Sequence, residues 1–279
     1  MSSTHTHEAD AADPRLADVF DECSFWCARF GEMLIDELEL PRDGAIVLDV
    51  DCGTGFPMLE LACRCGAACR FVGVDLWPEA LRRAELKRDF HGQPNVLIAR
   101  ADSARLPVAD ASIDLIIMNL GINNFADPPA VLRDCARVCR RGGRFALTTN
   151  CRGCYREFYD LFQALLIERG LSDALPRLQA NIDHRGSRES LTAALSEAGF
   201  GGIRAAEREC VMRFADAGAM MRHPLVRLGF LDGWRAVIGA DRWTDILAEL
   251  QRRLNDISAR DGVLRMTAPM LYLESRREP

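Results

Sequence analysis

The chain is almost without lysine, because Lys87 is the single lysine among its 35 basic residues and the others are arginines. These arginines are spread along the sequence and form no dense basic block, and 41 acidic residues give a formal net charge of −6. Nucleic-acid binding normally leaves a clustered basic footprint that neutralises phosphates. The sequence therefore disfavours a nucleic-acid partner, and an arginine-rich composition gives no reason to assign any one arginine to an anion.

Long apolar runs are also missing. The longest, such as residues 113–118, have the length of a strand and fall short of the roughly 20 residues that span a bilayer. The first residues, MSSTHTHEADAADP, contain neither a basic nor an apolar segment of the kind found in secretory signals. We therefore expect no membrane span and a cytoplasmic protein.

The chain contains 11 cysteines, but it lacks the patterns that would give most of them a special role. With no secretory signal expected and a chain long enough for an ample core, we expect reduced and mostly buried thiols. Cys151 and Cys154 form a C-x-x-C, yet neither a second such pair nor an H-x-x-x-H accompanies it. No metal site is therefore predicted, and the role of this pair stays open.

The most informative segment is residues 47–57, VLDVDCGTGFP. Its apolar beginning predicts a buried parallel strand. Gly53 and Gly55 allow a tight turn and a close approach of the backbone to a ligand, and Pro57 suits the first turn of a helix. A dinucleotide fingerprint, G-x-G-x-x-G, would need glycine in place of Met58. The segment therefore predicts a nucleotide-type cofactor at the end of this strand and disfavours a dinucleotide.

This segment resembles the first motif of the class I S-adenosylmethionine-dependent methyltransferases, in which a strand and an acid precede G-x-G-x-G. Asp49, Gly53 and Gly55 match that motif, whereas Asp51 stands where the family usually has its first glycine. Aspartate tolerates a positive φ better than most residues, so we expect the turn to be kept.

Three further segments match the family in order. An apolar strand ends at Asp75, where an acid can accept hydrogen bonds from both ribose hydroxyls, although it could instead start the following helix. Asp102 and Ser103 end a third strand, and the resemblance implies that this acid meets the adenine amino group. The step after it, Leu106 to Asp114, is similar to the ubiquinone and menaquinone biosynthesis branch. In RRGGRFALTTN, residues 140–150, the glycine pair is expected to form a turn before a fifth strand.

The resemblance implies S-adenosyl-L-methionine as cofactor. It implies contacts from a set of strand-end residues, namely Asp49, Asp51, Gly53, Thr54, Gly55, Asp75, Leu76, Asp102, Ser103 and Asn119. For Asn119 two interpretations stay open, since it can contact the cofactor or substrate, or can simply fix the loop after the fourth strand.

The fold that follows is α/β: a Rossmann-like methyltransferase sheet of seven strands, mostly parallel with an antiparallel last strand, flanked by helices and covered by a helical lid. We expect a disordered tail at 1–13 and a single domain at 14–279. Within this domain we expect N-terminal helices at 14–40 and a cofactor-binding core at 45–150. We expect helical lid insertions at about 151–200 and 215–258. The last two strands are expected at 203–214 and 263–276.

Methyl transfer requires alignment and exclusion of water more than it requires catalytic groups. No catalytic residue is therefore assigned. A hydroxyl or carbon acceptor would need a general base, for which His184, His223 and Tyr155 are candidates. For each of the two histidines, a role on the surface or in packing is the favoured interpretation.

The predicted function is methyl transfer from S-adenosylmethionine to a small or lipid-like acceptor at O, C or N, with a homodimer possible. The loop MNLGINNF lacks the Asn-Pro-Pro-Tyr motif of enzymes that methylate DNA bases or glutamine, which disfavours those acceptors. The alternatives are an aminopropyl or other alkyl transferase on the same fold, and a cofactor-binding protein without turnover. The many cysteines also leave a metalloid methyltransferase as a minor alternative.

Overall fold

The structure is a computed structural model that describes residues 17–18 and 24–278 of the 279-residue chain. The expected tail at 1–13, and most of the first of two expected N-terminal helices, lie outside the described residues. The second of these helices is present as α2 (Ser24–Glu37).

The described residues form one seven-stranded sheet with the order β3-β2-β1-β4-β5-β7-β6. Strands β1 to β5 pair in parallel, and β7 runs antiparallel to both β5 and β6. The strands are β1 (Ile46–Val50), β2 (Arg70–Asp75), β3 (Val96–Arg100), β4 (Ile113–Asn119), β5 (Cys139–Asn150), β6 (Phe200–Phe214) and β7 (Leu264–Arg277). The predicted mostly parallel sheet with an antiparallel last strand is confirmed.

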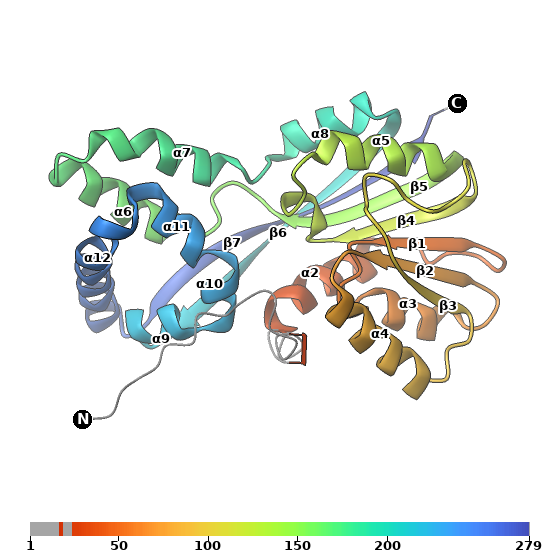
Figure 1. Cartoon of the computed structure of the whole chain (residues 1–279), viewed down its shortest axis with the longest axis horizontal. Helices are drawn as coiled ribbons and strands as arrows, with labels where there is room; N and C mark the ends of the chain where they lie inside the picture. The colour runs from red at the N-terminus through yellow and green to blue at the C-terminus, as the bar shows by residue number, and fades with distance from the viewer. Residues whose placement is uncertain (1–16, 19–23, 279) are drawn as a thin grey trace.

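Helices cover both faces of the sheet, with α2, α3 and α4 on one side and α5 and α8 on the other (Figure 1). The further helices that lie on the β1–β5 part of the sheet are α3 (Met58–Cys65), α4 (Pro78–Phe90), α5 (Pro128–Val138) and α8 (Arg188–Glu197). Ser187 caps the amino end of α8, and its side chain accepts a hydrogen bond from the Ser190 amide at 3.2 Å.

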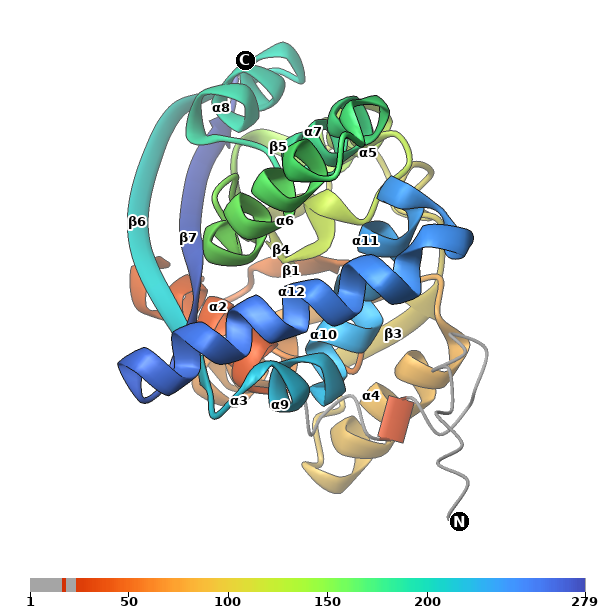
Figure 2. The same ribbon diagram turned by 90° about the vertical axis from the view of Figure 1, so that its left-hand side faces the viewer.

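A second group of helices gathers at one end of the molecule, where the long strands β6 and β7 reach beyond the rest of the sheet (Figure 1). Figure 2 shows α12 lying across this end. These helices, which we call the lid, are α6 (Arg156–Glu168), α7 (Leu175–Asp183), α9 (Ala217–Arg222), α10 (Pro224–Gly229), α11 (Leu231–Ile238) and α12 (Ala240–Asp261). Insertions were expected at about 151–200 and 215–258; α12 extends beyond the second of these ranges to Asp261, and α8, which lies in the first, packs on the sheet.

The lid is packed around Trp234 of α11, which is completely buried. Its indole stacks on the ring of Phe158 with centroids 3.8 Å apart, and its Nε1 donates a hydrogen bond to the Tyr159 hydroxyl at 3.0 Å. Both partners belong to α6, so Trp234 joins the helices that follow β5 to those between β6 and β7.

The start of β5 differs from the expectation. Pairing with β4 begins at Cys139, and its register shifts between Ile113 and Leu115, opposite the glycine pair. Gly142 has φ +72°, and a Cβ on Gly143 would lie 2.8 Å from the carbonyl oxygen of Arg140. The two glycines therefore make an irregularity within the strand, not a turn that precedes it.

Candidate active site

The glycine loop, residues 51–57, connects β1 to α3 at the carboxyl end of the sheet. Asp51, Gly53 and Gly55 have φ values of 66°, 52° and 98°. A Cβ on Gly55 would lie 2.7 Å from Leu59 Cδ1, so side chains are excluded there. Asp51 lies in the left-handed region, which aspartate tolerates better than most residues.

Three carboxyl groups, Asp49, Asp51 and Asp75, meet beside this loop, and we call them the acid cluster. Asp75 is 7% exposed and accepts hydrogen bonds from the Gly53 and Trp77 amides, each at 2.8 Å. A carboxylate oxygen can accept a further hydrogen bond, so Asp75 retains the capacity to bind a pair of hydroxyls. The ribose assignment stays a prediction to which this geometry is suited.

The acid cluster crowds negative charge in a buried place. Burial, and then the charges of Asp51 and Asp75, raise the pKa of Asp49 well above its usual value. Burial and the neighbouring Asp75 raise the pKa of Asp51 to about 6. A hydrogen bond from the Asn124 side chain at 3.3 Å acts in the opposite direction and lowers this pKa. Because each charge favours a positive neighbour, the cluster is suited to a cationic ligand.

A pH-dependent contribution to stability follows from Asp51. Its folded-state pKa of about 6 exceeds the ordinary 3.8, so the free energy of unfolding should fall as the pH rises through this interval. Asp51→Asn should remove this cost, and should therefore be more stable than the parent by roughly 1 to 3 kcal/mol above pH 6 but not near pH 4. Urea unfolding of both proteins at pH 4 and pH 7.5 measures the difference. An equal difference at both pH values would show that Asp51 is not the titrating group.

The remaining predicted cofactor residues lie along the same edge. Asp75 is in register with Arg100 at the end of β3, so β3 presents Asp102 and Ser103 beside β2. Asp102 is exposed, and its Oδ1 accepts a hydrogen bond from the Ala104 amide at 2.9 Å. Leu76 is 56% exposed, which leaves an apolar surface suited to a purine ring. These contacts stay predictions.

Asn119, at the end of β4, already has protein partners. Its Oδ1 accepts a hydrogen bond from Thr148 Oγ1 at 2.7 Å, and its Nδ2 donates to the Cys27 carbonyl oxygen at 3.2 Å. The side chain thus ties β4 to β5 and α2, as in the loop-fixing interpretation. A contact with the cofactor stays a prediction.

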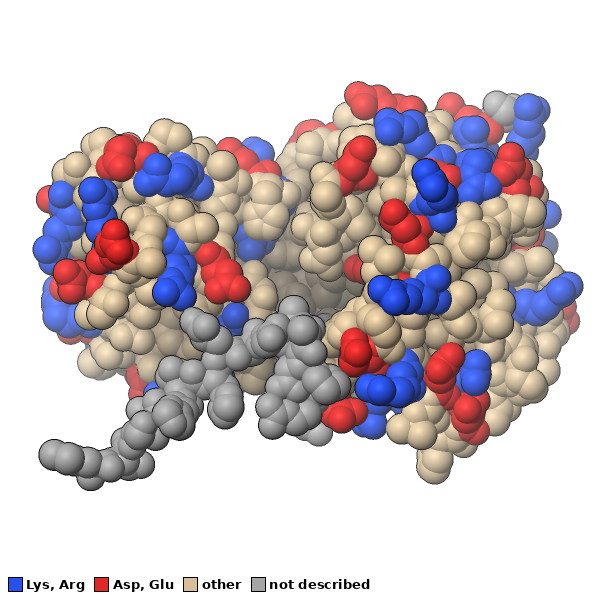
Figure 3. Space-filling view, in the orientation of Figure 1, with Lys and Arg blue, Asp and Glu red and all other residues tan. Residues whose placement is uncertain are grey.

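A cavity of about 240 Å³, the central cavity, lies between the ends of β4 and β5 and the lid. In the space-filling view the surface is hollowed between the two parts of the molecule (Figure 3). Asn124 lines the cavity and also donates its hydrogen bond to Asp51, so the cavity adjoins the acid cluster. Its walls are Trp26, Cys27, Leu120, Asn123, Asn124, Asn150, His184, Arg185, Leu225, Leu228, Gly229 and Phe230.

Of the three candidate bases, His184 lines the central cavity. Its Nδ1 lies 2.6 Å from the carbonyl oxygen of Asn181, so in the neutral ring Nδ1 carries the proton and Nε2 keeps a lone pair. Burial, and then the charge of Arg185, lower its pKa. A neutral histidine with a free Nε2 has the form that a general base requires.

The other two candidates have different surroundings. His223 Nδ1 accepts a hydrogen bond from the Leu225 amide at 3.2 Å and so caps α10. Tyr155 is completely buried, stacks on Phe230 at 4.6 Å, and its hydroxyl lies 3.3 Å from the sulfur of Met212. Burial also raises the pKa of this phenol. The catalytic roles stay predictions, and the arrangement favours His184 among the three.

The structure adds cavity residues that the sequence did not single out as site residues, notably Asn150, Arg185 and Phe230. Arg185 had no distinguishing signal among so many arginines. Phe230 belongs to an apolar segment that is equally typical of core packing.

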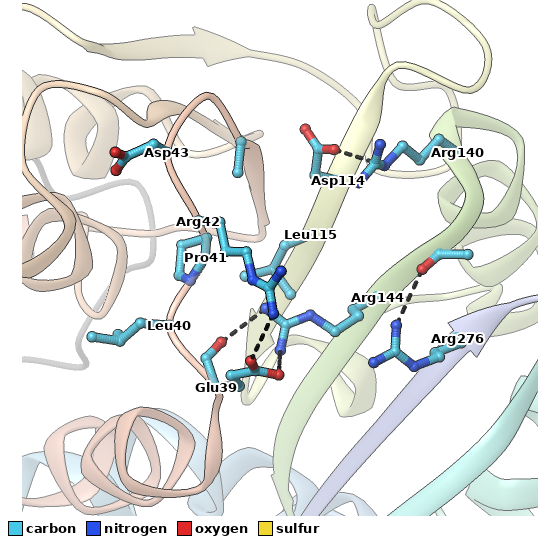
Figure 4. A pocket seen from close by; sticks show the side chains of 12 residues that line it. Glu39, Leu40, Pro41, Arg42, Asp43, Asp114, Leu115, Arg140, Arg144 and Arg276 are labelled. Atoms are coloured by element: carbon cyan, nitrogen blue, oxygen red, sulfur yellow. Dashed lines mark hydrogen bonds and ion pairs between the residues drawn. The ribbon is translucent and has the colours of Figure 1, made fainter.

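A different cavity, of about 470 Å³, lies at the opposite edge of the sheet (Figure 4). Its walls include Asp114 and Leu115, where β4 begins, and arginines from several segments. Arg140 pairs with Asp114 at 2.6 Å, and Arg144 pairs with Glu274 at 3.1 Å. Parallel α/β sheets bind ligands at the carboxyl ends of their strands, so this cavity is not the candidate active site.

The Cys151 and Cys154 thiols are free, and burial raises their pKa to about 12 and about 11, respectively. Both are therefore neutral near pH 7. Within residues 17–18 and 24–278, no group of three or more His, Cys, Asp or Glu side chains could hold a metal ion. The same ranges contain no helix long and apolar enough to cross a membrane.

The strand order, the glycine loop and the acids after β1 and β2 together define a Rossmann-like methyltransferase domain. Residues 48–147 match a family model described as "Methyltransferase domain". The chain thus contains a methyltransferase domain, and for this domain the methyltransferase class predicted from the sequence is confirmed.

Three comparisons describe what the chain is similar to. A 2-phytyl-1,4-naphtoquinone methyltransferase of Nostoc punctiforme is 30% identical over 147 residues, which cover 51% of this chain and 64% of that protein. This chain thus spans slightly less than two thirds of that relative. A nocamycin O-methyltransferase of Saccharothrix syringae is 27% identical over 277 residues, which cover 95% of this chain and 97% of that protein. The YcgJ protein from Bacillus subtilis shares the fold with a TM-score of 0.59 at 18% identity, covering 90% and 99%.

Proposed function

We propose that the protein transfers a methyl group from S-adenosylmethionine to a small-molecule or lipid-like acceptor at O, C or N. The observation that carries the proposal is that the central cavity adjoins the acid cluster through Asn124 and Asp51. A cationic donor held by the acids would thereby face an acceptor in the cavity. The names of the relatives, which include acceptors of different chemistry, support a small molecule without specifying which one.

Residues of the glycine loop would hold the donor. Gly53 and Gly55 leave room for a close backbone approach, Asp75 would accept the ribose hydroxyls, and Asp102 would face the adenine. The sulfonium supplies an already activated methyl group. What the chain must provide is alignment and exclusion of water, worth about 7 to 11 kcal/mol for well-aligned reactants.

The cavity walls would orient the acceptor. Trp26 and Phe230 provide aromatic surface, with ring centroids 6.3 Å apart and nearly perpendicular planes. His184 would accept a proton from a hydroxyl or carbon acid, whereas an acceptor that is already anionic would need no base. As further parts of the proposal, we place the protein in the cytoplasm and allow for a homodimer.

The proposal is tested in two stages. Calorimetry with S-adenosylmethionine, S-adenosylhomocysteine and NAD⁺ should show micromolar-range binding of the first two and no comparable binding of the third. Incubation with methyl-labelled donor and a panel of phenols, carboxylic acids, quinols and amines should then label an acceptor. Donor binding without labelling of any acceptor would favour the non-catalytic alternative. Transfer from decarboxylated S-adenosylmethionine instead would favour the aminopropyl transferase.

A further inference from the structure

Arg185 is a buried arginine that pairs with no acidic side chain among the residues that the structure describes. It is 5% exposed and lines the central cavity. Its Nη1 donates hydrogen bonds to the Tyr159 hydroxyl at 3.3 Å and to the Asn181 carbonyl oxygen at 3.2 Å. Within the part of the chain that the structure describes, Nε and Nη2 donate no hydrogen bond.

Asp183, two residues before Arg185, and Glu157 of α6 have other partners. Asp183 pairs with Arg152 at 2.9 Å, and Glu157 accepts hydrogen bonds from Thr267. By contrast, Arg144, whose side chain is 12% exposed, pairs with Glu274 at 3.1 Å. A buried cation is normally paired, because removing it from water is costly. Arg185 departs from this rule at the wall of a cavity.

The nearest titratable groups do not supply the missing charge. The positive charge of Arg185 opposes the effect of burial on Cys154 and Tyr159, yet the pKa of each stays above its ordinary value, at about 11 for Cys154. Both side chains are therefore neutral near pH 7. An anion that neutralises Arg185 has to come from outside this part of the protein.

The guanidinium is held in place by its surroundings. Its central carbon lies 4.8 Å from the centroid of the Phe230 ring. The Tyr159 hydroxyl that accepts its hydrogen bond also accepts one from Trp234 and donates to Asn181 Oδ1 at 2.7 Å. A cation fixed in this way is ready to bind an anion without reorganisation.

We propose that Arg185 binds a carboxylate of the methyl acceptor, and that the acceptor is therefore an anionic molecule with an apolar, preferably aromatic body. The free Nε and Nη2 lie on one edge of the guanidinium, which matches the two oxygens of a carboxylate. Leu225, Leu228 and Phe230 line the same cavity and would pack against the body. The cavity then adjoins Asp51 through Asn124 on the side of the cationic donor, and presents the positive charge of Arg185 to the acceptor.

The inference rests on the proposed function, and its test can fail separately. The probes are 2-naphthoate and its neutral analogue 2-naphthamide, titrated into the full chain saturated with S-adenosylhomocysteine. The parent should bind 2-naphthoate at least tenfold more tightly than 2-naphthamide. Arg185→Gln should lose this preference, and Arg185→Lys, which keeps the charge but not the two-donor edge, should lose most of it.

Arg177→Gln is the matched control, since Arg177 donates to the Val237 carbonyl oxygen at 2.7 Å and does not line the central cavity. It should retain the preference. All variants should bind S-adenosylhomocysteine like the parent. Equal binding of the two probes to the parent, or no binding of 2-naphthoate, would overturn the inference even if the arginine variants failed to fold. Loss of cofactor binding by the parent would instead refute the proposed function.

Discussion

Asp75→Ala is expected to lower the affinity for S-adenosylmethionine and S-adenosylhomocysteine at least tenfold. Hydrogen bonds to a charged acceptor contribute about 1.5 to 3 kcal/mol each, and two ribose hydroxyls would lose their acceptor. The Gly53 and Trp77 amides would lose theirs as well. Calorimetry with both ligands measures the loss. Asp89→Ala, which changes an exposed aspartate paired with Arg88 at 2.7 Å, is the control and should have no effect.

The two causes of this loss can be separated with ligands that lack a ribose hydroxyl. If Asp75 binds the hydroxyls, deoxyribose analogues should bind the parent weakly, and Asp75→Ala should weaken them little further. If Asp75 only fixes the glycine loop, the variant should lose the same factor for every ligand. Unchanged affinity of Asp75→Ala for the natural ligands would refute the ribose assignment.

Trp234→Ala is expected to lower the free energy of unfolding by about 3 to 5 kcal/mol, the range for truncating a buried tryptophan. Trp234 is completely buried, stacks on Phe158 and donates a hydrogen bond to Tyr159. Trp234→Phe keeps an aromatic ring and loses the N–H donor, and should cost about 1 to 2 kcal/mol. Urea unfolding monitored by circular dichroism provides both values.

The same substitution should reach the central cavity. The Tyr159 hydroxyl accepts hydrogen bonds from both Trp234 and Arg185. Loss of Trp234 would therefore leave this hydroxyl, and Arg185 with it, less firmly positioned. We expect Trp234→Ala to weaken ligands of the cavity while leaving binding at the glycine loop intact. A loss of stability below 1 kcal/mol would show that the helices following β5 and those between β6 and β7 do not depend on this residue.

The candidate cofactor residues could be predicted from the sequence because their signals are local. An apolar strand, an acid and two glycines follow one another within residues 47–57, and each residue type has a physical reason for its place. The strand that ends at Asp75 repeats the pattern. By contrast, the glycine pair before Arg144 was predicted to precede the strand, because glycines suit a turn. The structure places the pair within the strand, because Cys139 already pairs with Ile113, and a pairing between distant residues leaves no local signal in the sequence.

The walls of the central cavity could not be predicted from the sequence, because they leave no local signal. The central cavity is formed by residues far apart in the chain, such as Trp26, Asn124, Arg185 and Phe230. None of them carries a signal that separates a cavity wall from ordinary packing. Arg185 is distinguished by having no acidic partner within residues 17–18 and 24–278, and only the three-dimensional structure reveals this. His184 could be named as a candidate, but the sequence offered no way to prefer it to His223.

The antiparallel pairing of β6 with β7 has a consequence for how the helices between them can vary. These strands pair from Phe200 with Arg277 to Phe214 with Leu264, so the chain leaves the sheet and returns to it at adjacent points. Helices α9 to α12 are thus a detour whose length and sequence can change while every strand keeps its neighbours. A change in this detour would alter the part of the central cavity that α10 lines, and would leave the glycine loop and the acid cluster in place.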